Sequence, residues 1–127
     1  MSTTGLVLAA LAALLHVYIF YLESLVWTTR ARAVFGTTRE EAAATRELAF
    51  NQGFYNLFLG VVAAIGIVLT ASGHEGAGLA LVYAGAGSMV AAAAVLFLSS
   101  PGKRSAALKQ GLIPLLAIIV LVAGRVI

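Results

Sequence analysis

The chain has 127 residues, of which 61% are hydrophobic and 10% charged, with a mean hydropathy of +1.02 and a formal net charge of +3. A soluble domain carries about 25% charged residues, so this composition predicts a protein whose main solvent is lipid. The absence of cysteine excludes disulfides, thiolate metal sites and cysteine nucleophiles, and we expect no nucleic-acid partner because no basic face is visible.

Four apolar segments are each long enough to cross a bilayer as a helix, which needs about 20 residues. They run from about 5 to 28, 48 to 71, 77 to 98 and 107 to 126. The last three are joined by the short links ASGHEG and SSPGKRS, and short links make sequential helices antiparallel neighbours. We therefore predict an all-α membrane protein, a single domain over residues 1–127 built as a four-transmembrane-helix up-down bundle.

The basic residues are distributed unevenly between the two ends of this bundle. Seven of the eight belong to the first and third connections or the adjoining helix ends: Arg30, Arg32, Arg39, Arg46, Lys103, Arg104 and Lys109. The eighth, Arg125, lies at the other end. Because connections rich in Lys and Arg stay in the cytoplasm, we expect a multi-pass protein of the bacterial inner membrane with its N- and C-termini outside.

The second helix is expected to begin before the membrane does. Thr38-Arg-Glu-Glu41 has the Thr-x-x-Glu form of a capping box, in which side chains and backbone amides satisfy one another at a helix start. A helix from Thr38 to Ala71 would exceed the hydrocarbon thickness and project about two turns into the cytosol.

The third segment carries a ladder of small residues spaced four apart: Ala80, Ala84, Ser88 and Ala92. Small residues let helix backbones approach closely, which is how helices associate in lipid. The ladder can pack inside one bundle or between protomers. Four thin helices bury little surface, so we expect a homo-oligomer.

The first segment contains two polar residues that are costly in lipid, His16 and Glu23, within HVYIFYLESLVW. At about 100° per residue, Ala12, His16, Glu23 and Trp27 fall within about 60° of one another. His16 then lies near the bilayer midplane, and Glu23 lies about 10 Å closer to the cytoplasm. Trp27 is expected to be an interfacial anchor, since aromatic belts occur at that depth.

The second segment enters from the cytoplasm with NQGFYN, residues 51–56. Asn51 and Tyr55 are four apart, as are Gln52 and Asn56, so each pair stacks on one side of the helix. Together the four residues cover an arc of about 140°, which is broad for a single hydrogen bond between helices.

The fourth segment adds an amide at the same depth. Pro114 cannot donate to the backbone carbonyl of Gln110, so that carbonyl and the Gln110 side chain share one layer. We therefore predict a polar cup open to the cytoplasm, with His16 as its floor and an apolar outer half. The residues expected to bind a ligand or proton there are His16, Glu23, Asn51, Gln52, Tyr55, Asn56 and Gln110.

Simpler interpretations of these residues stay open. Glu23 can reach the interface and pair with Arg30, Arg32 or Arg46 instead of facing a ligand. His16 can form a hydrogen bond to a neighbouring helix, and the amides of NQGFYN can join helices without forming a site.

The series His16-Val-Tyr-Ile-Phe-Tyr-Leu-Glu23, then Trp27, then Asn51-Gln-Gly-Phe-Tyr-Asn56 resembles the pattern of a family of small four-helix bacterial membrane proteins, known as a domain of unknown function. The resemblance covers nearly the whole chain. It implies a four-span inner-membrane protein and carries no activity with it.

The overall form is similar to that of the small multidrug-resistance exporters, which have four short spans, an acidic residue on the first helix, nearby aromatics and dimeric assembly. A carboxylate in a low-dielectric site can exchange a proton for an organic cation. We therefore expect a transporter-like protein whose cup binds or moves a small solute, cation or proton. Against this, Glu23 lies near the interface, and the second half of the chain does not repeat the motif.

Two alternatives remain. In the first, the cup is a membrane-embedded, isomerase-like active site for a lipophilic substrate, with His16 and Glu23 as general acid and base. Tyr55 and the amides of Asn51 or Asn56 would then polarise a substrate oxygen. In the second, the protein is a lipid-binding or accessory subunit, and both residues are structural.

We expect no metal site, because two helical ligands for one metal should lie about four residues apart, and His16 and Glu23 are seven apart. No cofactor is expected either, with a haem held by His16 as the alternative. The expected partners are membrane lipid and a small-molecule or ion ligand.

Overall fold

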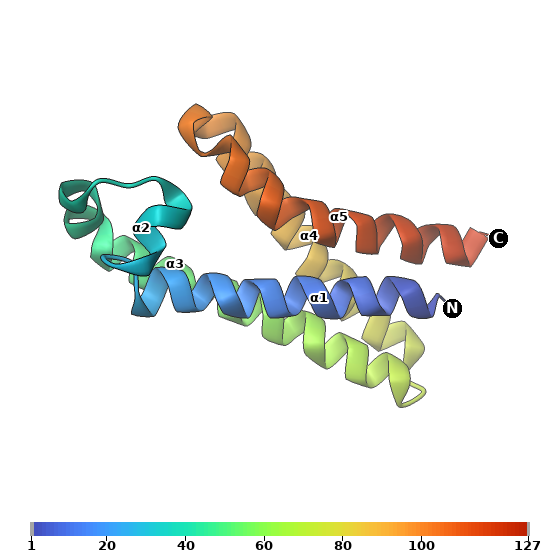
Figure 1. Cartoon of the computed structure of the whole chain (residues 1–127). Coiled ribbons are helices and arrows are strands. Elements are labelled where there is room, and N and C mark those ends of the chain that lie inside the picture. The colour runs from blue at the N-terminus through green and yellow to red at the C-terminus, as the bar shows by residue number, and fades with distance from the viewer. Residues whose placement is uncertain (1, 127) are drawn as a thin grey trace.

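The computed structural model describes residues 2–126, which are almost entirely helical (Figure 1). The elements in chain order are α1 (Thr3–Phe20), a π-helical turn η1 (Tyr21–Leu25), α2 (Arg30–Phe35), α3 (Arg39–Ala71), α4 (Glu75–Ser99), a 3-10 turn η2 (Pro101–Lys103) and α5 (Arg104–Val126). Four helices are long and apolar enough to cross a membrane: α1 with η1, α3, α4, and α5 with η2. The predicted four-helix membrane fold is therefore confirmed.

The four long helices pack in a ring, with α1 against α3, α3 against α4, α4 against α5, and α5 against α1. Figure 1 shows both chain termini at one end of the bundle, here called the terminal end. The short helix α2 and the turn between α4 and α5 lie at the opposite end, here called the α2 end. Large apolar side chains such as Leu14, Phe58 and Leu112 point outward, as expected for helices in contact with lipid.

The terminal half of the bundle is closely packed and apolar. One cluster of buried residues comprises Ala9, Leu79, Val82, Ala117 and Leu121, and a second comprises Ala12, Ala13, Ala63 and Met89. Glycines allow the backbones to approach, since a Cβ at Gly66 would lie 2.6 Å from the carbonyl oxygen of Gly78 on α4. The space between the four helices is therefore filled in this half.

Most of the ladder of small residues on α4 lies on the outer face of that helix. Ala80, Ala84, Ser88 and Ala92 are all exposed. The buried face of α4 is formed by residues that include Gly78, Val82, Gly85 and Met89, which repeat at helical spacing on another side of the helix. Ala80, Ala84 and Ser88 therefore do not pack inside this bundle, whereas Ala92 lines a pocket between the helices.

The start of α3 has the predicted capping box. The Glu41 amide donates to the Thr38 hydroxyl at 3.1 Å, and the Thr38 amide donates to the Glu41 carboxylate at 3.1 Å. With 33 residues, α3 is about 50 Å long and exceeds a hydrocarbon core of about 30 Å. The predicted extension of α3 beyond the membrane is therefore consistent with its length.

The first span differs from the regular helix expected over 5–28. Its α-helical part ends at Phe20, and the chain continues as the π-helical turn η1 to Leu25. The backbone then leaves the helix at Val26, whose φ of −130° and ψ of 28° are not helical. Because the helix ends there, the residues after Val26 fold back over the α2 end of the bundle.

Candidate functional site

The π-helical turn η1 holds Glu23 against α3. The Val26 amide donates to the carbonyl of Tyr21 at 3.2 Å, five residues back, as in a π-helix. The neighbouring Ser24 hydroxyl donates to the carbonyl of Phe50 at 2.8 Å, and Gly53 leaves the room that this approach needs. Single π-helical turns inside helices occur frequently at functional sites.

The Glu23 side chain is 7% exposed and is held by an amide of α3. The Asn56 side-chain nitrogen donates to one Glu23 carboxylate oxygen at 3.1 Å and to the carbonyl of Gln52 at 3.2 Å. One carboxylate oxygen is thus fixed. A buried carboxylate in a membrane protein normally marks a functional site, so Glu23 indicates that a ligand site lies close by.

A pocket of about 230 Å³ opens beside Glu23 at the α2 end. It is lined by residues from all four spans and from α2: Glu23, Trp27, Phe35, Thr45, Leu48, Ala49, Gln52, Asn56, Ala92, Leu96, Lys103 and Gln110. Pockets that hold drug-sized ligands measure about 300–1,000 Å³, so this one suits a smaller molecule or part of a larger one.

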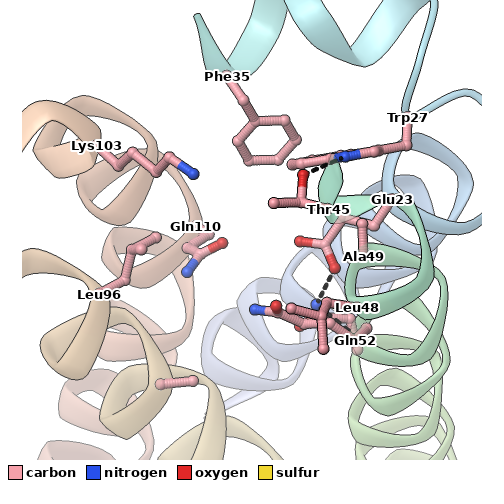
Figure 2. Close-up of a pocket in the computed structure, with 12 residues that line it drawn as sticks. Glu23, Trp27, Phe35, Thr45, Leu48, Ala49, Gln52, Leu96, Lys103 and Gln110 are labelled. Carbon is pink, nitrogen blue, oxygen red and sulfur yellow. Dashed lines mark hydrogen bonds between the residues drawn. The ribbon is translucent and has the colours of Figure 1, made fainter. Parts of the chain in front are cut away.

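Two walls of the pocket carry opposite charge. Figure 2 shows Glu23 and Thr45 on one wall, with Lys103 and Gln110 facing them across the open space. Lys103 ends the turn η2. The adjacent Arg104 does not line the pocket; it donates to the carbonyl of Phe97 at 3.0 Å and stacks on the Phe97 ring.

Aromatic rings cover the top of the pocket in the view of Figure 2. The Trp27 indole donates to the Thr45 hydroxyl at 3.0 Å, and its ring lies 5.3 Å from that of Phe35 on α2. Trp27 is 9% exposed and packs against Ala42 and Ala49 of α3, and its expected role as an interfacial anchor stays a prediction. The indole turns inward because the chain leaves the helix after Leu25.

The structure brings four of the seven predicted ligand residues together at this pocket: Glu23, Gln52, Asn56 and Gln110. Asn51 and Tyr55 do not line it, and Tyr55 is 68% exposed on the outer surface. Each residue turns a helix by about 100°, so only one of the two stacked pairs in NQGFYN faces the interior.

His16 also lies apart from the pocket. It is 2% exposed, and its Nδ1 donates to the carbonyl of Ala12, one turn earlier, at 2.9 Å. The Nδ1 of His16 is thus satisfied within its own helix. The pocket has no histidine floor in this structure.

None of the three arginines considered as partners of Glu23 lines the pocket. Arg30 donates instead to the hydroxyl of Tyr21 at 2.8 Å. The cation that faces Glu23 is Lys103, from a connection that is remote in sequence. In the sequence, only the positive charge of Lys103 and its predicted position near the cytoplasm indicated that it could face Glu23.

Thr45 was also missed, although its spacing gives a signal. Thr45, Ala49, Gln52 and Asn56 are separated by four, three and four residues, which is the spacing of one face of an α-helix. All four line the pocket. The segment before the membrane therefore contributes to the site, although its charged sequence is typical of a solvated extension of α3.

Across residues 2–126, no group of three or more His, Cys, Asp or Glu side chains is placed to hold a metal ion. The expectations on cofactors, including the haem alternative at His16, stay untested predictions.

A protein-family model described as "Protein of unknown function (DUF1304)" matches residues 10–122 of the chain. The matched range includes every residue that lines the pocket. No curated protein and no solved structure gave a match. The family match agrees with the resemblance noted from the sequence, and it adds no activity.

Proposed function

The chain belongs to the DUF1304 family of proteins of unknown function, and on that premise we propose that it is a small transporter-like membrane protein. Its pocket would bind a small solute or cation, and Glu23 would take up and release the exchanged proton. The observation that carries this proposal is the Glu23 carboxylate, which is buried, held by Asn56 and turned to the pocket. Carboxylates so placed in membrane proteins serve ion and proton pathways.

The one-sided form of the pocket supports the same proposal. The pocket lies at the α2 end, while apolar clusters fill the terminal half. A solute site open to one side and sealed on the other is what alternating access requires of one state. From the basic residues at the α2 end, we propose that this side faces the cytoplasm and that the protein resides in the bacterial inner membrane.

The isomerase-like alternative has less support. It needed His16 and Glu23 as an acid and base at one substrate, and His16 does not line the pocket. Tyr55, the expected oxygen-polarising group, lies on the outer surface. The accessory-subunit alternative would leave the pocket between Glu23 and Lys103 without a use, so transport is the function that the geometry supports best.

We retain the homo-oligomer as part of this proposal. The ladder residues Ala80, Ala84 and Ser88 are exposed on α4 and remain available to pack against a second copy. The large apolar side chains on the outer surface would contact membrane lipid.

The replacement Glu23→Gln tests the proposed role of the carboxylate. Glutamine keeps the shape of the side chain and can accept the Asn56 hydrogen bond, but it cannot carry a proton. In proteoliposomes loaded with choline and a pH-sensitive dye and diluted into choline-free buffer, wild-type protein should exchange choline for protons and acidify the lumen faster than protein-free liposomes do. The Glu23→Gln variant should fall to the protein-free rate.

Glu40→Gln provides the matched control, because Glu40 is exposed in the first turn of α3 and does not line the pocket. It should keep the wild-type rate. A Glu23→Gln variant as fast as wild type, or a wild-type rate equal to that of empty liposomes, would show that Glu23 does not move protons.

A further inference from the structure

The pocket holds one carboxylate and one ammonium on opposite walls, with open space between them (Figure 2). Glu23 is bound by Asn56 from its own side of the pocket. Lys103 extends from η2 toward the same space. A charge in a poorly solvated site calls for a partner of opposite sign, and each of these two groups can receive one from a ligand.

The wall that carries Glu23 suits a cationic group. Trp27 lines the pocket beside the carboxylate, its ring held by the hydrogen bond to Thr45 and by contact with Phe35. Ammonium groups bind to the faces of aromatic rings, and tryptophan binds them best. A carboxylate beside an aromatic pair therefore offers an ammonium group both of its usual binding elements.

The wall that carries Lys103 suits an anionic group. The Lys103 ammonium has three donors, and the Gln110 amide next to it adds two more. Charge-assisted hydrogen bonds from such donors to a carboxylate or phosphate are shorter and stronger than neutral ones. The apolar residues Ala92 and Leu96 on the same side limit competing water.

We infer that the pocket binds a zwitterion, with its ammonium group against Glu23 and Trp27 and its anionic group against Lys103 and Gln110. This inference rests on the proposed function, since it names the class of solute that the pocket takes. A single positive or negative ion would leave one wall unpaired. The volume of about 230 Å³ restricts the bound part to the size of an amino acid or a lipid headgroup.

Such a zwitterion has two sources, a free solute and the headgroup of a lipid. An apolar pocket of about 100 Å³ adjoins the site between α1 and α5, and both pockets are lined by Phe35 and Gln110. Leu15, Ile19 and Leu22 line the second pocket, and such apolar side chains would pack favourably against an acyl chain. The experiment therefore includes one arm for each source.

The test measures binding to purified protein in a non-ionic detergent by calorimetry and by the fluorescence of Trp27, the one tryptophan of the chain. The probes are glycine betaine, choline and 3,3-dimethylbutyrate, three molecules of similar shape that carry both charges, the positive charge or the negative charge. Betaine should bind about tenfold or more tightly than either of the others, since each lost charge-assisted contact removes at least that much.

Two variants assign the charges to the walls. Lys103→Gln should weaken betaine binding to the level of choline and leave choline binding unchanged. Glu23→Gln should weaken betaine binding to the level of 3,3-dimethylbutyrate and leave that ligand unchanged. The retained ligand shows in each case that the pocket is still folded.

The second arm compares glycerophosphocholine with dihexanoylphosphatidylcholine below its micellar concentration. Tighter binding of the acylated probe assigns the site to a lipid headgroup, and equal binding assigns it to a free solute. Betaine binding no tighter than choline or 3,3-dimethylbutyrate, or no binding of any zwitterionic probe, would overturn the inference. Proton flux through Glu23 that persists without zwitterion binding would refute this inference alone, and binding without flux would refute transport alone.

Discussion

The Gly53→Ala variant is expected to be less stable than the wild type by about 1–3 kcal/mol and to lose the ligand pocket. A Cβ at Gly53 would collide with the Ser24 hydroxyl and lie 3.0 Å from the Ser24 amide nitrogen and 3.1 Å from the Glu23 Cβ. The hydroxyl can rotate away, but it then loses its hydrogen bond to Phe50, which contributes about 1 kcal/mol. The contact with the Ser24 amide nitrogen can be relieved only by a shift of the η1 backbone away from α3.

The higher helix propensity of alanine opposes this destabilisation, but it contributes less than the steric clash and the lost hydrogen bond together cost. Alanine stabilises a helix interior by about 1 kcal/mol relative to glycine, and Gly53 lies inside α3. The matched control isolates this effect: a Cβ at Gly87 in α4 meets nothing within 4 Å, so Gly87→Ala should be neutral or slightly stabilising. Unfolding in sodium dodecyl sulfate, followed by Trp27 fluorescence, measures both. Equal stability of the two variants would contradict the close contact between η1 and α3.

The second large effect is expected for Asn56→Leu, which removes the donor to Glu23 with little change in volume. A hydrogen bond to a charged group contributes about 1.5–3 kcal/mol, so the variant should lose proton flux by about 10- to 100-fold. The same liposome assay as for Glu23→Gln measures this loss. An unchanged elution volume on size-exclusion chromatography would show that the variant is folded.

The matched control is Asn51→Leu, the same substitution five residues earlier on the same helix. Asn51 is exposed and does not line the pocket, so this variant should retain the wild-type flux. Equal losses in the two variants would mean that the amides act as helix contacts in general and that Asn56 has no special relation to Glu23.

Much of this architecture can be predicted from the sequence because lipid imposes strict rules. Four apolar stretches of sufficient length predict the four spans, and the Thr38 capping box predicts the start of α3. That Glu23, an amide pair of NQGFYN and Gln110 share one polar layer follows from depth, since polar residues at one depth avoid lipid by facing one another.

The remaining features depend on contacts that a single helix does not encode. The π-helical turn at Glu23 is held by α3 through Phe50 and Gly53, so the periodicity of the first segment does not reveal it. Which amide pair of NQGFYN faces inward depends on the rotation of α3 against α1. The Nδ1 of His16 is bound to the carbonyl of Ala12 in its own helix, and a buried histidine of that kind has the same sequence pattern as a ligand.

Phe35 and Lys103 show a second limit of sequence reasoning. Both belong to connections between spans, whose composition predicts orientation and says little about contacts. Phe35 reaches the pocket because α2 folds back over α3, and the buried Ala31 of α2 clusters with Ala42 and Ala49 of α3. Small residues in a charged connection give no clear signal of such packing.

A water-accessible pocket between Glu23 and Lys103 that opens to the cytoplasm can be tested with single cysteines. The natural chain has no cysteine, so Gln52→Cys and Tyr55→Cys each introduce one thiol. Gln52 lines the pocket, whereas Tyr55, one turn away, lies on the outer surface where lipid would cover it. A membrane-impermeant methanethiosulfonate reagent is applied to inside-out vesicles and, separately, to spheroplasts.

Gln52→Cys should react in inside-out vesicles and be protected in spheroplasts, while Tyr55→Cys should react in neither until detergent is added. Reaction of Gln52→Cys from the outside, or equal reactivity of the two thiols in inside-out vesicles, would contradict a pocket that opens to the cytoplasm.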